Sequence, residues 1–560
     1  EAPPTPLIEL AAPFGDNMVL QRGKEVPVWG WGKPDTKITV AFAGQTKSAT
    51  AGPAGKWMLK LDPLEASSEE RDFSVSSSDG RSIALKGVLV GEVWFSSGQS
   101  NMVWIASKSM CRDLAKEIAS AEEDIPIREI NIKTESALYP QDRATSEEGW
   151  KKSIKAGGFS ALSLSFAHEL YRELDVPIGI LLSAHSNTRI EAFTQREAIL
   201  AHPELQDDAN KIIDADPLTE QGRAAYEQYE TDILAWQEEA GAAALAAARM
   251  PQRPNLPGIA GMWRGPSQFY NGKIHPVIPY AIRGAIWCQG TSNSADGAIY
   301  AARMEALVNG WRDAWGMPDM PFYFTQMQSY GNSTTPEDVG FAEIRQSQHK
   351  FFIENRANVG MVVQFDVNAH NAGGIHYFNK LHPGKRMARW ALAKQYGKDI
   401  AYTGPIFSGY EVDGDEVVVS FEKGSLFGGL MVGSKDSVSD NGKSGRETEP
   451  AEPSPGEKLG GFRLCGADNR WHAAEAKIVG ETVVVTSSNV SKPVGVQYAY
   501  NAVPESANLY NKAGLPATPF AQIDGEFILT SHAERTAELQ AKYAQYIDPN
   551  YPILQFTEYF

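Results

Sequence analysis

The run Val88–Phe95 is almost continuously apolar and leads straight into the polar stretch Ser96–Met102. An apolar run without alternation is typical of a strand buried on both faces, and such strands belong to parallel sheets covered by helices. Similar runs alternate with helical patterns further along the chain, which predicts an α/β domain of three layers with a mainly parallel sheet. The strands expected are Ile178–Leu182, Ala285–Cys288, Phe322–Met327 and Val359–Phe365, and the clearest helices are Ser160–Leu174 and Tyr300–Trp315.

At 560 residues the chain exceeds what one core supports, so several domains are expected. Short strands between Gly, Pro and Asp turns predict a β-sandwich before the α/β domain and a second β-rich domain after it. The expected units are 1–88 (N-terminal β-sandwich), 89–404 (α/β domain, with a solvated helical insertion at about 206–258), 405–530 (β-rich domain, with a Gly/Ser-rich loop at Ser434–Lys458) and 531–560 (helix Ser531–Tyr546 and tail).

The net charge of -17, from 52 basic and 69 acidic residues, disfavours nucleic acid or an anionic membrane as partner. No apolar run approaches the roughly 20 residues of a membrane helix. The chain starts at Glu1 with Ala-Pro-Pro-Thr-Pro, as a mature protein does after signal removal, so a secreted or periplasmic protein is expected. The oligomeric state stays open.

Three scattered cysteines, Cys111, Cys288 and Cys465, are too few for a disulfide framework and allow one pair at most. The helical stretch with His168 and Glu169 lacks the second histidine of a zinc helix, and no nucleotide-binding loop occurs. We therefore expect no metal and no cofactor.

Ser100 stands where the first apolar strand gives way to a helix-compatible sequence, in Gly98-Gln-Ser-Asn-Met102. An α/β sheet exposes side chains at the carboxyl ends of its strands, and a serine there also presents its own backbone N–H, half of an oxyanion hole. Ser100 is therefore a candidate nucleophile. The alternative is a serine that only caps the next helix.

His376, in Ile375-His-Tyr-Phe-Asn-Lys380, precedes the helical pattern Met387–Tyr396 near the end of the α/β domain. A serine nucleophile needs such a base, because its hydroxyl is protonated at neutral pH. Gln289 and Asn293 follow another strand end, and their amides can donate to a developing oxyanion. Several strand ends that deliver Ser, His and amides together predict a hydrolytic site.

Several segments resemble the sialate O-acetylesterase-like branch of the SGNH hydrolases, which are carbohydrate esterases with a flavodoxin-like fold. The segments are Gly91–Met102, Tyr270–Gly284, Trp287–Asn293, Arg345–Gln348, the His376 segment and Asp16–Gln21. The resemblance covers most of residues 10–400. It implies Ser100 as nucleophile, His376 as base and Gln289 near the oxyanion, and it supports export.

The chain departs from this pattern at three places. The usual Trp-Gly-Gly-Thr-Pro-Ile-Glu-Ala-Trp reads His185-Ser-Asn-Thr-Arg-Ile-Glu-Ala-Phe193, so Ser186 or Asn187 replaces a glycine that offers its N–H to the oxyanion. Thr291 replaces a glutamate, and the acid that often precedes the histidine is absent. Asp366 is then the candidate to orient His376, and a Ser–His dyad is the alternative.

The altered loop adds Arg189 and His185 beside the nucleophile, and Gln99 adjoins it. An arginine fork suits the oxygens of a fixed anion better than a neutral carbonyl, which raises a sulfated polysaccharide as an alternative substrate. The competing interpretation is that Arg189 pairs with a carboxylate such as Glu191. Three functions remain open: a serine-dependent O-acetyl hydrolase on a carbohydrate, a sulfate-ester hydrolase at the same site, and an inactive glycan-binding protein.

Overall fold

The computed structural model describes residues 8–331, 339–367, 374–434 and 450–529. The expected helix Ser531–Tyr546 and most of the Ser434–Lys458 loop lie outside these residues. Because the described sheets and helices alternate along the middle of the chain, the α/β class predicted from the sequence is confirmed.

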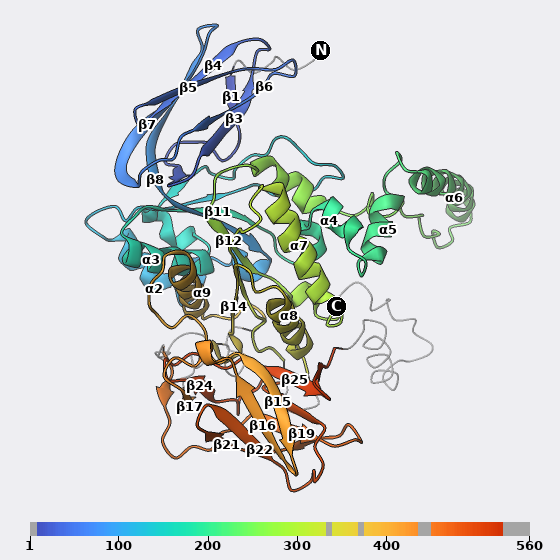
Figure 1. Cartoon of the computed structure of the whole chain (residues 1–560). Coiled ribbons are helices and arrows are strands. Elements are labelled where there is room, and N and C mark those ends of the chain that lie inside the picture. Colours follow the sequence, from blue (N-terminus) through green and yellow to red (C-terminus); the bar gives the residue numbers. More distant parts are fainter. Residues whose placement is uncertain (1–7, 332–338, 368–373, 435–449, 530–560) are drawn as a thin grey trace.

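The N-terminal residues form two small sheets (Figure 1). Lys56–Leu61 shows why: its residues are alternately exposed and buried, with apolar side chains on the inner face. One sheet contains β1 (Ile8–Leu10), β3 (Val26–Gly32) and β6 (Lys56–Leu61), and the other contains β2 (Val19–Gln21), β4 (Lys37–Phe42), β5 (Gln45–Thr50), β7 (Ser67–Ser77) and the first part of β8 (Ser82–Gly98).

The strand β8 belongs to both the N-terminal unit and the central sheet. Its residues alternate between exposed and half-buried over Ser82–Lys86 and are all buried from Gly87 to Gly98. The first part pairs with β7 in antiparallel orientation, and Glu92–Gly98 pairs with its neighbours in parallel. The sequence boundary expected at residue 88 therefore falls inside one continuous strand.

In the central sheet β8 lies between β11 and β12, and every pairing except that of β10 is parallel. The carboxyl end of β8 is thus flanked on both sides by the ends of parallel strands. The order is β10 (Lys151–Lys152), β9 (Ile127–Asn131), β11 (Ile178–Ala184), β8, β12 (Gly284–Cys288), β13 (Phe322–Thr325) and β14 (Val359–Val362).

Helices flank this sheet, α2, α3 and α9 on one side in Figure 1 and α7 and α8 on the other. Ser160 caps α3 by accepting a hydrogen bond from the Ser163 N–H. The expected insertion forms α5 and α6, of which α6 projects from the body and buries only Gly222 and Ala240. The bounds are α2 (Arg112–Ala119), α3 (Ala161–Leu174), α4 (Arg196–Ala201), α5 (Gln206–Asp214), α6 (Glu220–Leu245), α7 (Tyr300–Ala314), α8 (Ala342–Glu354) and α9 (Leu381–Gln395).

The C-terminal strands form three further sheets, and the sheet that contains β25 contacts α8. Gln346 of α8 exchanges hydrogen bonds with the backbone of Ala521, and Arg345 donates to the Asn501 carbonyl. The principal strands are β15 (Phe407–Asp413), β16 (Glu416–Phe421), β17 (Leu430–Ser434), β19 (Phe462–Cys465), β21 (Glu475–Val479), β22 (Thr482–Thr486), β23 (Gly495–Tyr498), β24 (Leu509–Asn511) and β25 (Phe520–Ile523).

A buried carboxylate, Glu92, lies at the point where β8 passes between the two units. It binds Arg22 at 2.6 Å and Arg283 at 2.8 and 3.0 Å, and it accepts a hydrogen bond of 3.0 Å from Gln21. Burial raises the pKa of Glu92, but the hydrogen bonds and charge of Arg283, with Arg22 and Gln21, outweigh this and hold the pKa below its ordinary value. Glu92 thus joins the N-terminal unit to the central sheet.

We expect Glu92→Gln to lower the melting temperature at neutral pH by roughly 5 °C or more, because it leaves two partly buried arginines without their carboxylate. The depressed pKa means that the carboxylate stabilises the fold above its ordinary pKa and that this contribution is lost as the pH falls. The deficit relative to the wild-type protein should therefore shrink on acidification. Calorimetry over a pH series measures it, with Glu25→Gln, from an exposed pair with Lys60, as the control that should change little.

Candidate active site

Ser100 begins a short helix, α1 (Ser100–Val103), immediately after β8. The turn is tight: Gly98 has φ +139°, and a Cβ there would lie 2.1 Å from the Cys288 carbonyl oxygen. The Gln99 N–H donates to that same oxygen at 3.0 Å. Ser100 is half-buried, and neither its hydroxyl nor its backbone N–H donates a hydrogen bond to any described residue. Both groups are therefore available to a ligand.

The loop that carries His376 is fastened to the turn after Ser100. The side chains of Asn101 and Gln328 each donate to the Ile375 carbonyl oxygen at 3.1 Å. The His376 ring stacks on Trp104, with centroids 4.6 Å apart and planes 18° apart. Partial burial, and then the charge of Lys380, hold the pKa of His376 below its ordinary value. The ring is therefore mainly neutral at pH 7, the state a general base needs.

The hydrogen bond expected between Ser100 and His376 is not among the contacts of the described residues. The proposed orienting acid, Asp366, is bound elsewhere: its two oxygens accept hydrogen bonds from Arg386 at 2.7 and 2.8 Å. Within the described part of the chain, neither a hydrogen bond nor an ion pair joins Asp366 to His376. Asp366 is thus bound to Arg386, and the orienting acid of His376 stays a prediction. His370, also near in sequence, lies outside the described residues.

The loop after β11 holds the two candidate oxyanion donors. Asn187 has φ +51°, a left-handed conformation that asparagine tolerates better than most residues and that a glycine adopts freely. Ser186 and Asn187 are exposed, and their backbone N–H groups have no acceptor within the described ranges. Gln99 is buried and its Oε1 accepts from the Ser292 N–H at 3.3 Å. The backbone donors expected at Ser186 and Asn187 are therefore present despite the missing glycines.

Gln289 and Asn293 do not have the free amides expected of oxyanion donors. The Gln289 amide nitrogen donates to the Thr188 carbonyl at 3.1 Å and to the Asn293 Oδ1 at 2.7 Å. The Asn293 amide nitrogen donates to Glu191 at 3.1 Å and to Asp296 at 2.7 Å. Since both hydrogens of each amide have protein acceptors, these two side chains connect the loop after β12 to the loop after β11 and have no hydrogen left for an oxyanion.

Arg189 is also bound within the protein, through three of its five guanidinium N–H groups. Its Nε donates to Glu191, its Nη2 to Asp296 at 2.6 Å, and its Nη1 to the Ser292 carbonyl at 3.3 Å. The pairing with Glu191, the competing interpretation, is therefore present, and it counts against a sulfate-binding role for Arg189. The same holds for His185 as an anion ligand, because burial, then Lys273 and Arg264, lower its pKa to about 4 and keep it neutral.

Arg189 is part of a buried ionic network that the sequence did not reveal. Arg303 of α7 pairs with Glu191 at 3.5 Å, with Asp296, and with Asp208 of α5 at 2.9 Å. Burial would raise the pKa of Glu191, but the two arginines lower it to about 2. The network fixes the loops after β11 and β12 to the helices behind them.

Two further residues near His376, Lys380 and Trp104, escaped the sequence analysis, although Lys380 lies in a segment that carries the resemblance. Lys380 is buried, and its Nζ donates to the Asn101 side chain at 2.7 Å and to the Tyr377 carbonyl at 2.6 Å. Trp104 carries the stacking contact with His376. The sequence did contain a signal for Lys380, because it lies in the His376 segment and a buried lysine is almost always paired with other polar groups. Nothing in the sequence marked Trp104.

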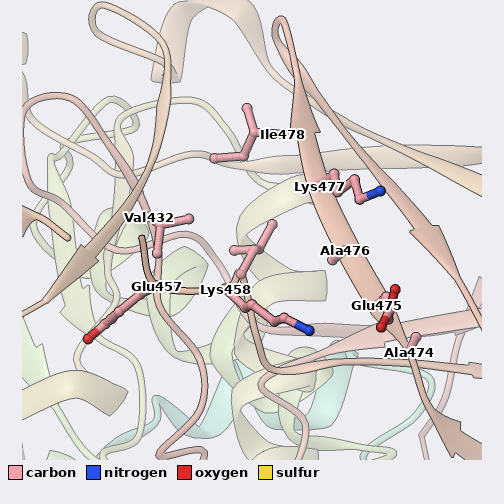
Figure 2. Close-up of a pocket in the computed structure, with 9 residues that line it drawn as sticks. Val432, Glu457, Lys458, Ala474, Glu475, Ala476, Lys477 and Ile478 are labelled. Atoms are coloured by element: carbon pink, nitrogen blue, oxygen red, sulfur yellow. The ribbon is translucent and has the colours of Figure 1, made fainter. Parts of the chain in front are cut away.

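The C-terminal unit holds a cavity of about 400 Å³ next to β17 and β21, with side chains such as Val432, Lys458 and Ile478 around it (Figure 2). A second, of about 470 Å³, is lined by Ser329, Asp366 and Tyr510 among others. Ser100 and His376 line neither.

The three cysteines, all within the described residues, are buried and form no disulfide. Over the same residues, no group of three or more His, Cys, Asp or Glu side chains is arranged to hold a metal ion. None of the described helices is both long and apolar enough to cross a membrane.

Comparison with known proteins finds similarity to carbohydrate esterases. Residues 260–393 match the family of carbohydrate esterases described as sialic acid-specific acetylesterase. The chain is 28% identical over 435 residues to the sialate O-acetylesterase of Rattus norvegicus, covering 70% of this chain and 75% of the relative. The human enzyme is 26% identical over 433 residues, covering 71% and 73%.

A solved structure agrees with these sequence matches over nearly the whole chain. A carbohydrate acetylesterase from Xanthomonas citri superposes with a TM-score of 0.72 at 27% identity, covering 92% of this chain and 99% of that one. The resemblance to the sialate O-acetylesterase-like carbohydrate esterases, first indicated by the motifs around Ser100 and His376, is therefore confirmed.

Proposed function

We propose that the protein is a serine-dependent esterase of the SGNH type that removes O-acetyl groups from a carbohydrate. The observation that carries the proposal is Ser100, at the carboxyl end of a central parallel strand with its hydroxyl and N–H both unused. The N-cap position of α1 is occupied by Gln99, so Ser100, the first residue of the helix, is not its capping residue. The comparisons support the carbohydrate ester as substrate class.

In the proposed reaction, His376 accepts the proton of the Ser100 hydroxyl while the serine oxygen attacks the acetyl carbonyl carbon. The oxyanion that forms accepts hydrogen bonds from the Ser100 N–H and from Ser186 or Asn187. The ester C–O bond then breaks, the sugar oxygen takes the proton from His376, and the acetyl group stays on Ser100. Water, deprotonated by His376, releases acetate and restores the serine.

His376 is proposed to work without an orienting carboxylate. The stack on Trp104 fixes the plane of the ring, and the two donors to Ile375 fix the backbone that carries it. The Ser100–His376 hydrogen bond would form with substrate bound, since catalytic hydrogen bonds are often long in free enzymes. A dyad also fits the replacement of the usual acid by Gly373-Gly374.

The sulfate alternative has little support, because Arg189 is paired with Glu191 and Asp296 and His185 is neutral. The inactive glycan-binding alternative differs from the proposal only in turnover, so it is an outcome of the same experiment.

The first test is acetate release from an O-acetylated sialoglycan and from acetylated xylan, with 4-nitrophenyl acetate as a small reporter. We expect the wild-type protein to release acetate and Ser100→Ala to lose at least roughly 10³-fold in kcat with an unchanged circular dichroism spectrum. Near-full activity of Ser100→Ala would contradict the serine mechanism. Glycan binding without turnover by the wild-type protein would favour the inactive alternative.

The second prediction concerns pH. His376 must be neutral to accept the serine proton, and its pKa lies below the ordinary value of 6.5. The acid limb of kcat/KM for 4-nitrophenyl acetate should therefore have its midpoint below pH 6.5, with activity lost as the pH falls through it. A midpoint at or above pH 6.5 would exclude a desolvated His376 as the base.

A third prediction separates anion binding from loop support at Arg189. Because Arg189 joins the loops after β11 and β12, Arg189→Ala should reduce turnover of the glycan and of 4-nitrophenyl acetate by similar factors and lower the melting temperature. Arg196→Ala, which breaks a pair with Asp216 on the helical insertion, is the matched control and should spare kcat on both substrates. A loss confined to an anionic substrate would restore the anion-binding role of Arg189.

A further inference from the structure

Trp263 is unusually exposed for a tryptophan of this chain. All 13 tryptophans lie within the described residues, and Trp263, at 53% exposure, is the one counted among the exposed large hydrophobic side chains. Leaving an indole in water forgoes the free energy that its burial would contribute. An exposed tryptophan therefore indicates a binding surface, whereas single exposed aliphatic side chains are common and indicate no function.

The indole is nevertheless held in place. It makes edge-to-face contacts with His185, at 5.0 Å between centroids, and with Phe269, at 5.3 Å. Phe269 is fully buried, and its ring also contacts His185 at 4.9 Å. Three mutually packed rings anchor one side of the indole and leave the rest of its surface to solvent. Trp263 is thus a preorganised apolar surface and needs no ordering when a ligand arrives.

This surface lies at the edge of the sheet that presents Ser100. The His185 N–H donates to the Gly98 carbonyl at 3.0 Å, and Gly98 is two residues before Ser100. The next residue after Trp263, Arg264, donates to the Asn187 carbonyl in the candidate oxyanion loop. The segment with Trp263 is therefore bonded to the loop beside the nucleophile.

The exposed indole of Trp263 is better suited to binding a sugar than to binding an anion or a protein partner. His185 behind the indole is neutral, because burial, then Lys273 and Arg264, lower its pKa. A single indole offers too little area for a protein interface, but it matches the C–H face of one sugar ring, whose hydroxyls can stay in water. An aromatic wall beside a few polar groups is the usual composition of a small-ligand site.

We propose that Trp263 is a substrate-binding residue whose indole packs against a sugar ring of the acetylated glycan, the ring that carries the scissile ester or its neighbour. This inference rests on the proposed function and deepens it, because it names the residue that distinguishes a glycan ester from a small acetate ester.

The test compares Trp263→Ala and Trp263→Phe with Met262→Ala, a change of the adjacent, 48% exposed side chain. For the glycan cleaved by the wild-type protein, Trp263→Ala should raise KM about tenfold, the loss expected from one aromatic contact. Its effect on kcat/KM for 4-nitrophenyl acetate should be at least about fivefold smaller, since that ester has no sugar ring. Trp263→Phe should recover most of the affinity, and Met262→Ala should match the wild-type protein on both substrates.

An unchanged glycan KM in Trp263→Ala, or equal losses on glycan and 4-nitrophenyl acetate, would overturn the proposal. If the wild-type protein releases no acetate from either glycan, the proposed function fails separately. Titration calorimetry with the same two glycans then decides the role of Trp263. Binding that Trp263→Ala removes and Met262→Ala keeps would support it, and binding that is absent, or equal in both variants, would overturn it.

Discussion

The whole molecule depends on β8, one strand that must satisfy two different sheets. Its first residues pair with β7 in a half-solvated antiparallel ribbon, and its later residues are enclosed between parallel neighbours. The change occurs near Gly91, where any Cβ would lie 1.9 Å from the Pro177 carbonyl oxygen. Because backbone hydrogen bonds fix the strand on both edges, its last residue and the Ser100 turn have little freedom. The position of Ser100, the candidate nucleophile, is thus set by the sheet, and the loops around it only complete the candidate site.

The loops after β11 and β12 are held in place by buried ion pairs. Arg189 and Arg303 lie among three acids, Glu191, Asp296 and Asp208, in an interior where an unpaired charge would be costly. The loop after β11 has a left-handed conformation at Asn187, and the N–H groups of Ser186 and Asn187 have no acceptor among the described residues. We infer that the ionic network stabilises this conformation, so the same arginine that looked like a ligand for substrate supports the backbone instead.

The sequence predicted the strands, the alternation with helices and the strand end at Ser100, because these depend on local periodicity and on neighbouring residues. It did not predict which polar side chains remain free. The amides of Gln289 and Asn293 donate to Thr188 and Glu191, which lie about 100 positions earlier in the chain. Only the order of the strands in the sheet brings these residues together. Asp366 and Arg386 are nearer in sequence, but their pairing depends on how α9 packs on the sheet. The exposure of Trp263 is likewise a property of tertiary packing that no sequence pattern carries.

The continuity of β8 also bears on how such a protein can be rearranged by recombination. A cut at residue 88, where the composition changes, would divide a strand and separate Glu92 from Arg22. The N-terminal unit therefore cannot be exchanged as a separate module, because it shares β8 with the turn that carries Ser100. The long helix α6, in contrast, stands off from the body with almost no buried residues. Insertions and deletions should therefore be tolerated best in α6, and chimaeras that add a new module should join it to the chain within this helix.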